Sequence, residues 1–208
     1  MSDLVFASVP IHGHVAPLLP LARHFVDRGD RVRFLTGSRF ADAVRATGAE
    51  HVRLPEGADF DDRSLTSLFP ERATMSPVKA IAFDFEHIFV RPAEHQFAAL
   101  TALIAEGADA VVCDPLLFGA ALLVQAPLEE RVPVVVAGMV PLALPGPGLA
   151  PFGTGIPPLD GLAGGIRNAI LRAATRRMFR PVDAAADEIA RRAIGRALTR
   201  PVMDWLPG

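Results

Sequence analysis

The segment of residues 4–28 most constrains how this chain can fold. Residues 4–9 are an apolar run that ends at a proline, as is typical of a strand buried on both faces of a sheet. The apolar residues after it recur at helical spacing, and Pro17 falls in the first turn, where a helix tolerates proline. The segment therefore predicts a buried strand that leads into a helix through a tight, glycine-centred turn at residues 11–14.

This turn carries His12 and His14 on either side of Gly13. In an open α/β sheet, ligands bind beyond the carboxyl ends of the strands, where helix N-termini present free N–H groups. A single histidine in such a loop is most simply a solvated side chain or a helix cap. Two histidines around a glycine at the first strand-to-helix turn favour a functional site.

The rest of the chain repeats the alternation of strand and helix. Further strands are expected at residues 31–36, 50–54, 110–113 and 133–137. Helices are expected at residues 39–46, at residues 76–105 and from about residue 116. Residues 55–74 are polar and irregular, and we expect a mobile loop there. The pattern predicts an α/β fold with a doubly wound, Rossmann-like parallel sheet.

The domain organisation expected from this pattern is a single domain over residues 1–208. Its core of βαβ units occupies residues 1–140, a loop rich in glycine and proline follows at residues 141–165, and residues 166–200 form arginine-rich amphipathic helices. Pro181 is expected to divide these helices, and their arginines to form a solvated face.

Composition narrows the range of partners. The net charge of -2 excludes the strong basic field of a nucleic-acid-binding protein, and it does not favour a membrane surface. Cys113 is the single cysteine, which excludes an intrachain disulfide and fits a reducing cytoplasm. The N-terminus has no pattern of a signal peptide, and the uncharged residues 132–159 contain too many prolines for a membrane-spanning helix. Small molecules are the favoured partners.

Asp114 is the second polar residue of interest, because it follows a strand of otherwise apolar residues. It either caps the next helix or contributes a carboxylate to the crevice at the strand ends. The Asp59-Phe60-Asp61 triplet has the form of a metal-binding motif, but it lies in a polar loop with no flanking strand. No glycine-rich dinucleotide motif follows a strand, so neither a metal nor an organic cofactor is expected.

The order of strand, Gly13-His14, two residues, Pro17 and amphipathic helix resembles the start of the family 1 glycosyltransferases of the GT-B fold. The chain is most similar to the actinobacterial members that modify macrolides and other natural products. This resemblance implies that the chain corresponds to the N-terminal, acceptor-binding half of such an enzyme. It also implies that His14 is the catalytic base and that Asp114 hydrogen-bonds one of its ring nitrogens.

The resemblance further implies an inverting transfer from a nucleoside diphosphate sugar to a hydroxyl group of a hydrophobic acceptor, which would be a natural product or a lipid. The positions that it assigns to the acceptor are Ile11, His12, Gly13, Phe85, Pro115, Leu116, Met139 and Val140. Phe85 is equally compatible with plain helix core, and His12 with a solvated position.

The motif with which such enzymes bind the nucleotide sugar does not occur in these residues. We therefore expect the chain to be a fragment or to work with a partner, to transfer no sugar alone, and to associate through an unpaired sheet edge. Two other interpretations stay open: a non-catalytic module that pairs with another subunit, and an α/β protein that binds a nucleotide or a flavin.

Overall fold

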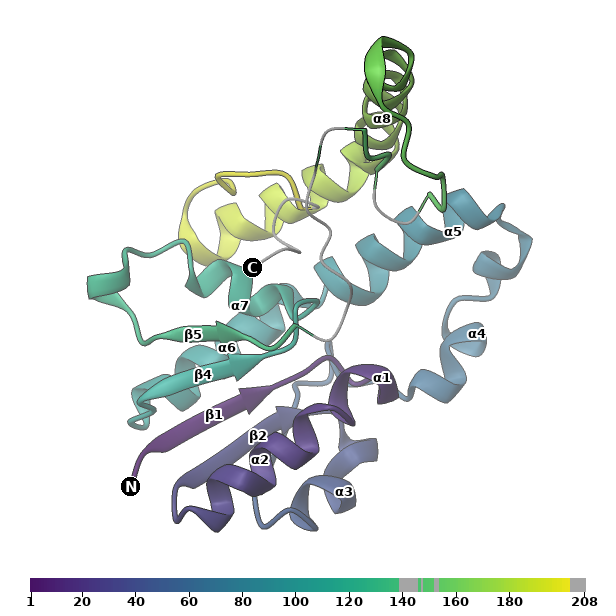
Figure 1. The fold of residues 1–208 in the computed structure, drawn as a ribbon. Helices are drawn as coiled ribbons and strands as arrows, with labels where there is room; N and C mark the ends of the chain where they lie inside the picture. Colours follow the sequence, from purple (N-terminus) through teal and green to yellow (C-terminus); the bar gives the residue numbers. More distant parts are fainter. Residues whose placement is uncertain (139–145, 147, 152–153, 203–208) are drawn as a thin grey trace.

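A computed structural model describes residues 1–138, 146, 148–151 and 154–202, with the side chain of Val78 excepted. Within these residues the chain forms a five-stranded parallel sheet with the strand order β3-β2-β1-β4-β5 (Figure 1). The strands are β1 (Asp3–Ala7), β2 (Arg31–Thr36), β3 (Glu50–Arg53), β4 (Ala110–Cys113) and β5 (Val134–Val136). The prediction of a doubly wound parallel α/β sheet is confirmed.

The strand order identifies the edge of the sheet where a ligand could bind. From β1 the chain proceeds outward through β2 to β3, and it then returns to β4 on the other side of β1. Phe6 of β1 pairs with Phe34 of β2 on one side and with Val112 of β4 on the other. The direction of winding therefore reverses between β1 and β4, and the loops after these two strands flank the crevice where ligands bind in such sheets.

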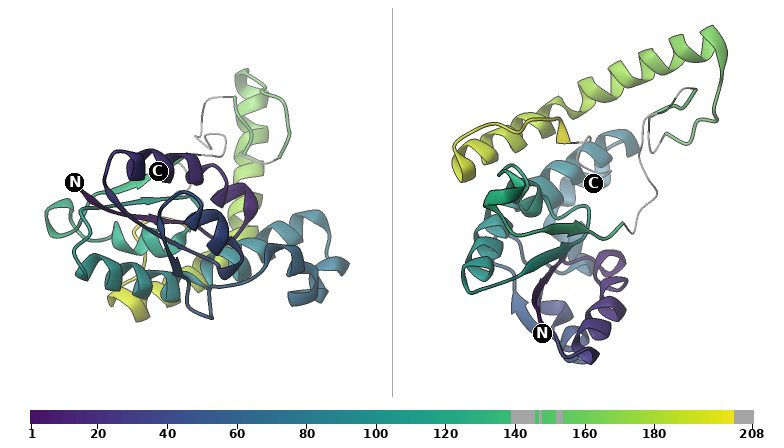
Figure 2. Two further views of the ribbon diagram at one scale, coloured as in Figure 1. Left: turned by 90° about the horizontal axis from the view of Figure 1, so that it is seen from below. Right: turned by 60° about the vertical axis from the view of Figure 1, so that its left-hand side comes forward.

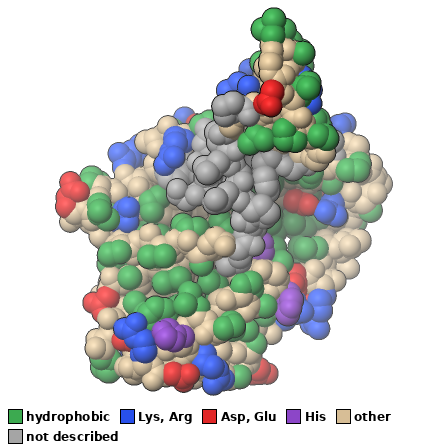
Figure 3. Space-filling view, viewed as in Figure 1, with side chains coloured by type: hydrophobic (Ala, Val, Ile, Leu, Met, Phe, Trp, Pro, Cys, Tyr) green, Lys and Arg blue, Asp and Glu red, His purple; other side chains and the backbone are tan. Residues whose placement is uncertain are grey.

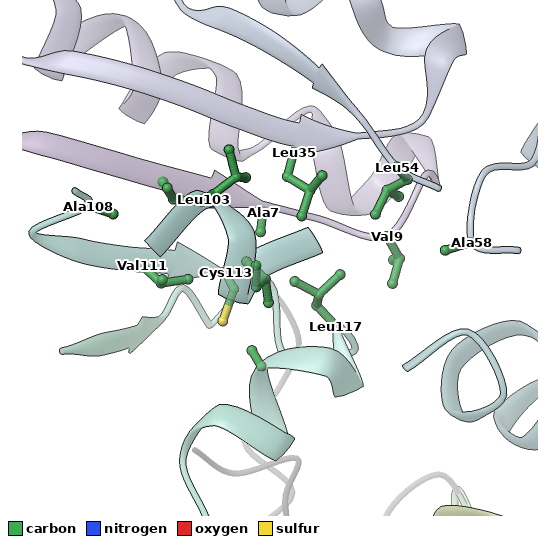
Figure 4. Close-up of a cluster of buried hydrophobic side chains, with 13 residues drawn as sticks. Ala7, Val9, Leu35, Leu54, Ala58, Leu103, Ala108, Val111, Cys113 and Leu117 are labelled. Carbon is green, nitrogen blue, oxygen red and sulfur yellow. The ribbon is translucent and has the colours of Figure 1, made fainter. Parts of the chain in front are cut away.

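Helices cover both faces of the sheet, as the uniformly apolar first strand requires. On one face Phe6 packs with Leu18 and Ala22 of α2 (Leu18–Asp27). On the other face Val5 and Ala7 belong to a cluster that includes Leu100 of α6 and Ala120 of α7 (Figure 4). The bounds of α3, α6 and α7 are Ala41–Arg45, Ala93–Ala105 and Phe118–Leu123.

Residues 55–74 are more regular than the sequence suggested. They contain a 3-10 helix (Asp62–Ser64), the short helix α4 (Leu65–Leu68) and a second 3-10 helix (Pro70–Thr74). The predicted irregular loop is therefore wrong for much of this segment, because single helical turns carry too few residues to show a period in the sequence.

The long helical segment that follows consists of three parts. These are α5 (Pro77–Asp84), a π-helical stretch (Phe85–Val90) and α6, which begins directly after Pro92. The helix expected over residues 76–105 is therefore interrupted at Pro92.

The C-terminal helices are one helix, α8 (Gly161–Ile194), so the predicted division at Pro181 is wrong. Phe179 and Val182 are buried on either side of the proline and pack in one cluster with Phe118 of α7 and Val90. Because both residues anchor the same helix face, tertiary packing offsets the lost hydrogen bond at the proline. The first half of α8 projects away from the sheet (Figure 2).

Exposed apolar side chains lie on this projecting half, at Leu162, Ile166 and Ile170 (Figure 3). Even so, no helix in the described part of the chain is long and apolar enough to cross a membrane.

Candidate active site

His14 lies in α1 (His12–Val15), a single helical turn between β1 and α2. The sequence predicted a tight turn here, and the structure shows that the turn is helical, with the N–H groups of His14 and Val15 donating to the carbonyl of Ile11. Val15 is fully buried and anchors the turn against the sheet. The side chain of His14 remains 14% exposed.

Asp114 follows β4 and reaches the His14 turn across the crevice. Its Oδ1 lies 3.0 Å from Nδ1 of His14, although the two residues are 100 positions apart in the chain. The carboxylate also accepts the backbone N–H groups of Val9 and Leu116, each at 2.8 Å. It does not cap α7, whose N-cap position is Leu117, and it instead ties the ends of β1 and β4 together.

These contacts define the proton positions on His14. Both carboxyl oxygens of Asp114 accept a backbone N–H group, and this arrangement favours the tautomer in which Nδ1 of His14 donates to the carboxylate. The lone pair of the imidazole is then on Nε2, which forms no hydrogen bond within the part of the chain that the structure describes. An imidazole held in this tautomer is suited to accept a proton from a substrate.

Phe89 is a neighbour of His14 that the sequence did not single out. Its ring centroid lies 6.3 Å from that of His14. The residue belongs to the π-helical stretch Phe85–Val90, and such stretches occur frequently at functional sites. A π-helical register leaves no period that sequence inspection can detect, so the sequence alone does not bring Phe89 to His14.

Phe85 packs on α8. Its ring lies 5.3 Å from that of Phe179 and 5.6 Å from that of Phe89. This position supports the core interpretation of Phe85, while its partial exposure leaves its role toward an acceptor a prediction.

The other acceptor positions fall around the same turn and loop. His12 and Gly13 are exposed, and Ile11 is half-buried against the central core. A Cβ atom built on Gly13 would meet no atom within 4 Å, so space is open next to this residue. The half-buried Pro115 and Leu116 lie in the loop after β4, whereas Met139 and Val140 lie outside the described residues.

A cavity of about 390 Å³ lies on the β5 side of Asp114. Its walls come from Asp114, Pro115, α7 and β5, together with Arg131, Thr199 and Arg200. His14 does not line it. The cavity therefore adjoins the histidine–aspartate pair but does not contain the imidazole nitrogen that would perform proton transfer.

Three other histidines make structural contacts. His87 stacks on Phe83 at 4.0 Å between ring centroids, and Nε2 of His51 lies 3.3 Å from the carbonyl oxygen of Gly37. His24 packs edge-to-face on Phe25.

The carboxylates of the Asp59-Phe60-Asp61 triplet are bound by arginines. Asp59 accepts from Arg53 and from the backbone and side chain of Ser38. Asp61 accepts from Arg63, and this hydrogen bond lowers the pKa of Asp61 to about 2. Among the described residues, no group of three or more histidine, cysteine or acidic side chains could hold a metal ion.

Cys113 adjoins the site but faces the core. Burial, with the neighbouring Asp114, raises the pKa of its thiol far above the ordinary value. A thiol with such a pKa is a buried apolar group, not a nucleophile.

The fold and the site together define a doubly wound α/β domain with a histidine–aspartate pair at the switch point of its sheet. No protein-family model matches the chain. It is 33% identical to 4'-demethylrebeccamycin synthase of Lentzea aerocolonigenes over 178 residues, which are 84% of this chain and 41% of that protein. It is also 33% identical to UDP-glycosyltransferase 2 of Phaeomoniella chlamydospora over 171 residues, 79% of this chain and 38% of that protein.

Solved structures agree with this relationship at the level of the fold. The glycosyltransferase of kitacinnamycin superposes with a TM-score of 0.56 at 19% identity, over 99% of this chain and 43% of that one. SnogD from Streptomyces nogalater gives a TM-score of 0.51 at 18% identity, over 96% and 43%. The chain is therefore a homologue of the GT-B glycosyltransferases, and it spans less than half the length of these relatives.

Proposed function

We propose that this chain is the acceptor-binding part, carrying the catalytic base, of an inverting glycosyltransferase. The reaction moves a sugar from a nucleoside diphosphate sugar to a hydroxyl group of a hydrophobic natural product or lipid. The observation that carries the proposal is the 3.0 Å contact between Nδ1 of His14 and Asp114 at the switch point of the sheet.

The chemistry requires a base on the acceptor side. The acceptor hydroxyl gives its proton to Nε2 of His14 as its oxygen attacks the anomeric carbon of the donor. The bond from that carbon to the diphosphate breaks, and the electron pair leaves with the nucleoside diphosphate. Asp114 stabilises the imidazolium that forms and holds the ring in the correct tautomer. Attack opposite the leaving group inverts the anomeric configuration.

The names of the relatives support a nucleotide sugar as co-substrate. Two of them are named as UDP-dependent enzymes, UDP-glucosyltransferase A1 of Starmerella bombicola and UDP-glycosyltransferase 2, and the glycosyltransferase VinC was solved in complex with dTDP at a TM-score of 0.52. The chain spans 41% of the rebeccamycin enzyme. We therefore propose that most contacts with the nucleotide are made by polypeptide outside these 208 residues.

The exposed side chains near His14 support a hydrophobic acceptor. Phe89 lies beside the imidazole, Ile11 is a partly buried apolar side chain of the same turn, and the space next to Gly13 is open.

The test is an assay of sugar transfer by the full protein that the gene encodes. It measures transfer of radiolabelled glucose from UDP-glucose or TDP-glucose to a panel of hydroxylated polycyclic aromatic and macrolactone acceptors. His14→Ala is expected to lower kcat about 10²–10⁴-fold, the contribution typical of a general base, with little change in the KM of the acceptor. Asp114→Asn should lower kcat as well, while the control His24→Ala leaves it unchanged. A His14→Ala enzyme with normal kcat would exclude the assignment of the base.

A further inference from the structure

The turn that carries His14 is held from its N-terminal side by a carboxylate from a distant loop. The backbone N–H of His12 donates to Oδ2 of Asp62 at 2.8 Å, across 50 residues of chain. The first N–H groups of a helical turn have no partner within the turn, and the N-cap residue Ile11 has no side chain that could accept from them. Asp62 therefore supplies the cap that the local sequence lacks.

Asp62 is itself fixed in place. Its carboxylate forms an ion pair with Arg39, which follows β2, and its side chain is only 13% exposed. The loop around it is tied to the same region by Asp59, which binds Ser38 and Arg53. Asp62 is thus a largely buried, charge-paired point of attachment for the His12–Val15 turn.

The two carboxylates act on opposite ends of one short segment. Asp114 binds the ring of His14, and Asp62 binds the backbone two residues earlier. In a turn of four residues, a change of the backbone at His12 displaces the ring at His14 relative to Asp114. A general base must lie within hydrogen-bond reach of its partner and its substrate, so small displacements reduce catalysis strongly.

We propose that Asp62, held by Arg39, is a positioning residue for His14. Its carboxylate caps the turn and thereby maintains the hydrogen bond between His14 and Asp114. The positioning role of Asp62 rests on the proposed function of His14. The effect of Asp62 on the hydrogen bond between His14 and Asp114 does not depend on that function, and it can be measured without sugar transfer.

The first experiment uses the 208-residue chain labelled with ¹⁵N-histidine. The ring ¹⁵N shifts report the tautomer of His14, and a low-field proton reports its hydrogen bond to Asp114. Asp62→Ala is expected to weaken the low-field signal and to speed amide exchange of Val15 and Ala16 about fivefold, as loss of one cap would.

Asp62→Asn keeps an oxygen acceptor at the same place and is expected to retain the signal. Glu56→Ala is the control, because Glu56 is an exposed carboxylate in the same segment, whereas Asp61 also pairs with Arg39 and is unsuitable. Arg39→Gln removes the charge partner of Asp62 and is expected to give an intermediate exchange rate, which keeps the proposal testable if Asp62→Ala does not fold.

An unchanged His14 signal and unchanged exchange in Asp62→Ala would overturn the proposal, and so would the same loss in Glu56→Ala. In the transfer assay, Asp62→Ala should lower kcat more than it changes the KM of the acceptor, with recovery in Asp62→Asn. If His14→Ala leaves kcat normal while Asp62→Ala still disturbs the ring signal, the proposed function fails and the positioning by Asp62 stands.

Discussion

Arg33 is the largest fully buried side chain in the described part of the chain, and its charge is compensated at the amino-terminal edge of the sheet. Its Nε and one terminal nitrogen donate to Oδ1 of Asp3 at 3.1 and 2.7 Å, and the other terminal nitrogen donates to Glu106 at 2.8 Å. Asp3 is 18% exposed, whereas Glu106 is 61% exposed. We therefore expect Asp3 to stabilise the buried guanidinium more than Glu106 does.

We predict that Asp3→Ala lowers the free energy of unfolding by about 2–4 kcal/mol, because it leaves a buried cation with one solvated partner. Glu106→Ala should cost less than about 1 kcal/mol, as is usual for an exposed pair. Urea denaturation of the three proteins measures both values. Equal losses in the two variants would contradict the assignment of Asp3 as the main partner of Arg33.

Asp59 makes stability depend on pH. Burial, the largest influence, raises the pKa of its carboxyl group, but hydrogen bonds from Ser38 and Arg53 outweigh burial and lower the pKa below the ordinary 3.8. The folded state therefore favours the carboxylate, and its contribution to stability is present above pH 3.8 and is lost as the pH falls through the lowered pKa.

We predict that the difference in free energy of unfolding between the wild-type protein and Asp59→Asn shrinks as the pH falls from 7 to 3. Urea denaturation at several pH values is the measurement. A difference that stays constant over this range would show that the carboxylate of Asp59 does not stabilise the folded loop.

The helices α6 and α7 pack closely together, and this contact depends on a glycine. A Cβ atom on Gly119 would lie 2.4 Å from Cβ of Gln96 and 2.7 Å from the backbone nitrogen of Phe97. The N–H of Gly119 also donates to the buried side chain of Gln96 at 2.9 Å. α7 can therefore lie under the loop of Asp114 only with a glycine at this position.

We predict that Gly119→Ala destabilises the protein by about 1–3 kcal/mol through this overpacking. Gly165 is the matched control, because it lies inside α8 and an added Cβ would meet nothing within 4 Å. Gly165→Ala should stabilise the protein by about 0.5–1 kcal/mol through helix propensity alone. Thermal unfolding of both variants tests the pair, and a neutral Gly119→Ala would refute the close packing of α6 on α7.

For the molecule as a whole, the two edges of the described sheet differ in composition. β3, Glu50–Arg53, carries charged residues that discourage pairing with another strand. β5 consists of three valines, of which Val135 is 54% and Val136 39% exposed. The β5 edge is therefore the place where this chain could associate through strand pairing.

We predict that the 208-residue chain associates in a concentration-dependent manner and that Val135→Lys shifts it toward the monomer. Sedimentation velocity over a range of concentrations measures the shift, and thermal unfolding should show little change because Val135 is exposed. A lysine at the exposed Glu56 serves as the control, since it alters charge without touching β5. Equal association of all three proteins would exclude the β5 edge as the contact.

The sequence by itself determined the sheet and the placement of His14 and Asp114 at one crevice. His14 lies in the turn after the first predicted strand and Asp114 directly follows the fourth, and the carboxyl ends of parallel strands lie at one edge of a sheet. Local periodicity is enough for this inference, because it depends only on the order of the elements. The resemblance to glycosyltransferases added the roles of both residues.

Only the tertiary structure decided which groups hold the imidazole of His14 and that α8 continues through Pro181. The cap from Asp62, the ring of Phe89 and the continuity of α8 through Pro181 all depend on contacts between segments far apart in the chain. Such contacts follow from the register of π-helical and 3-10 turns and from the packing of whole elements, and neither leaves a period in the sequence. The elements of this protein are encoded locally, whereas the geometry of its site is fixed by long-range packing.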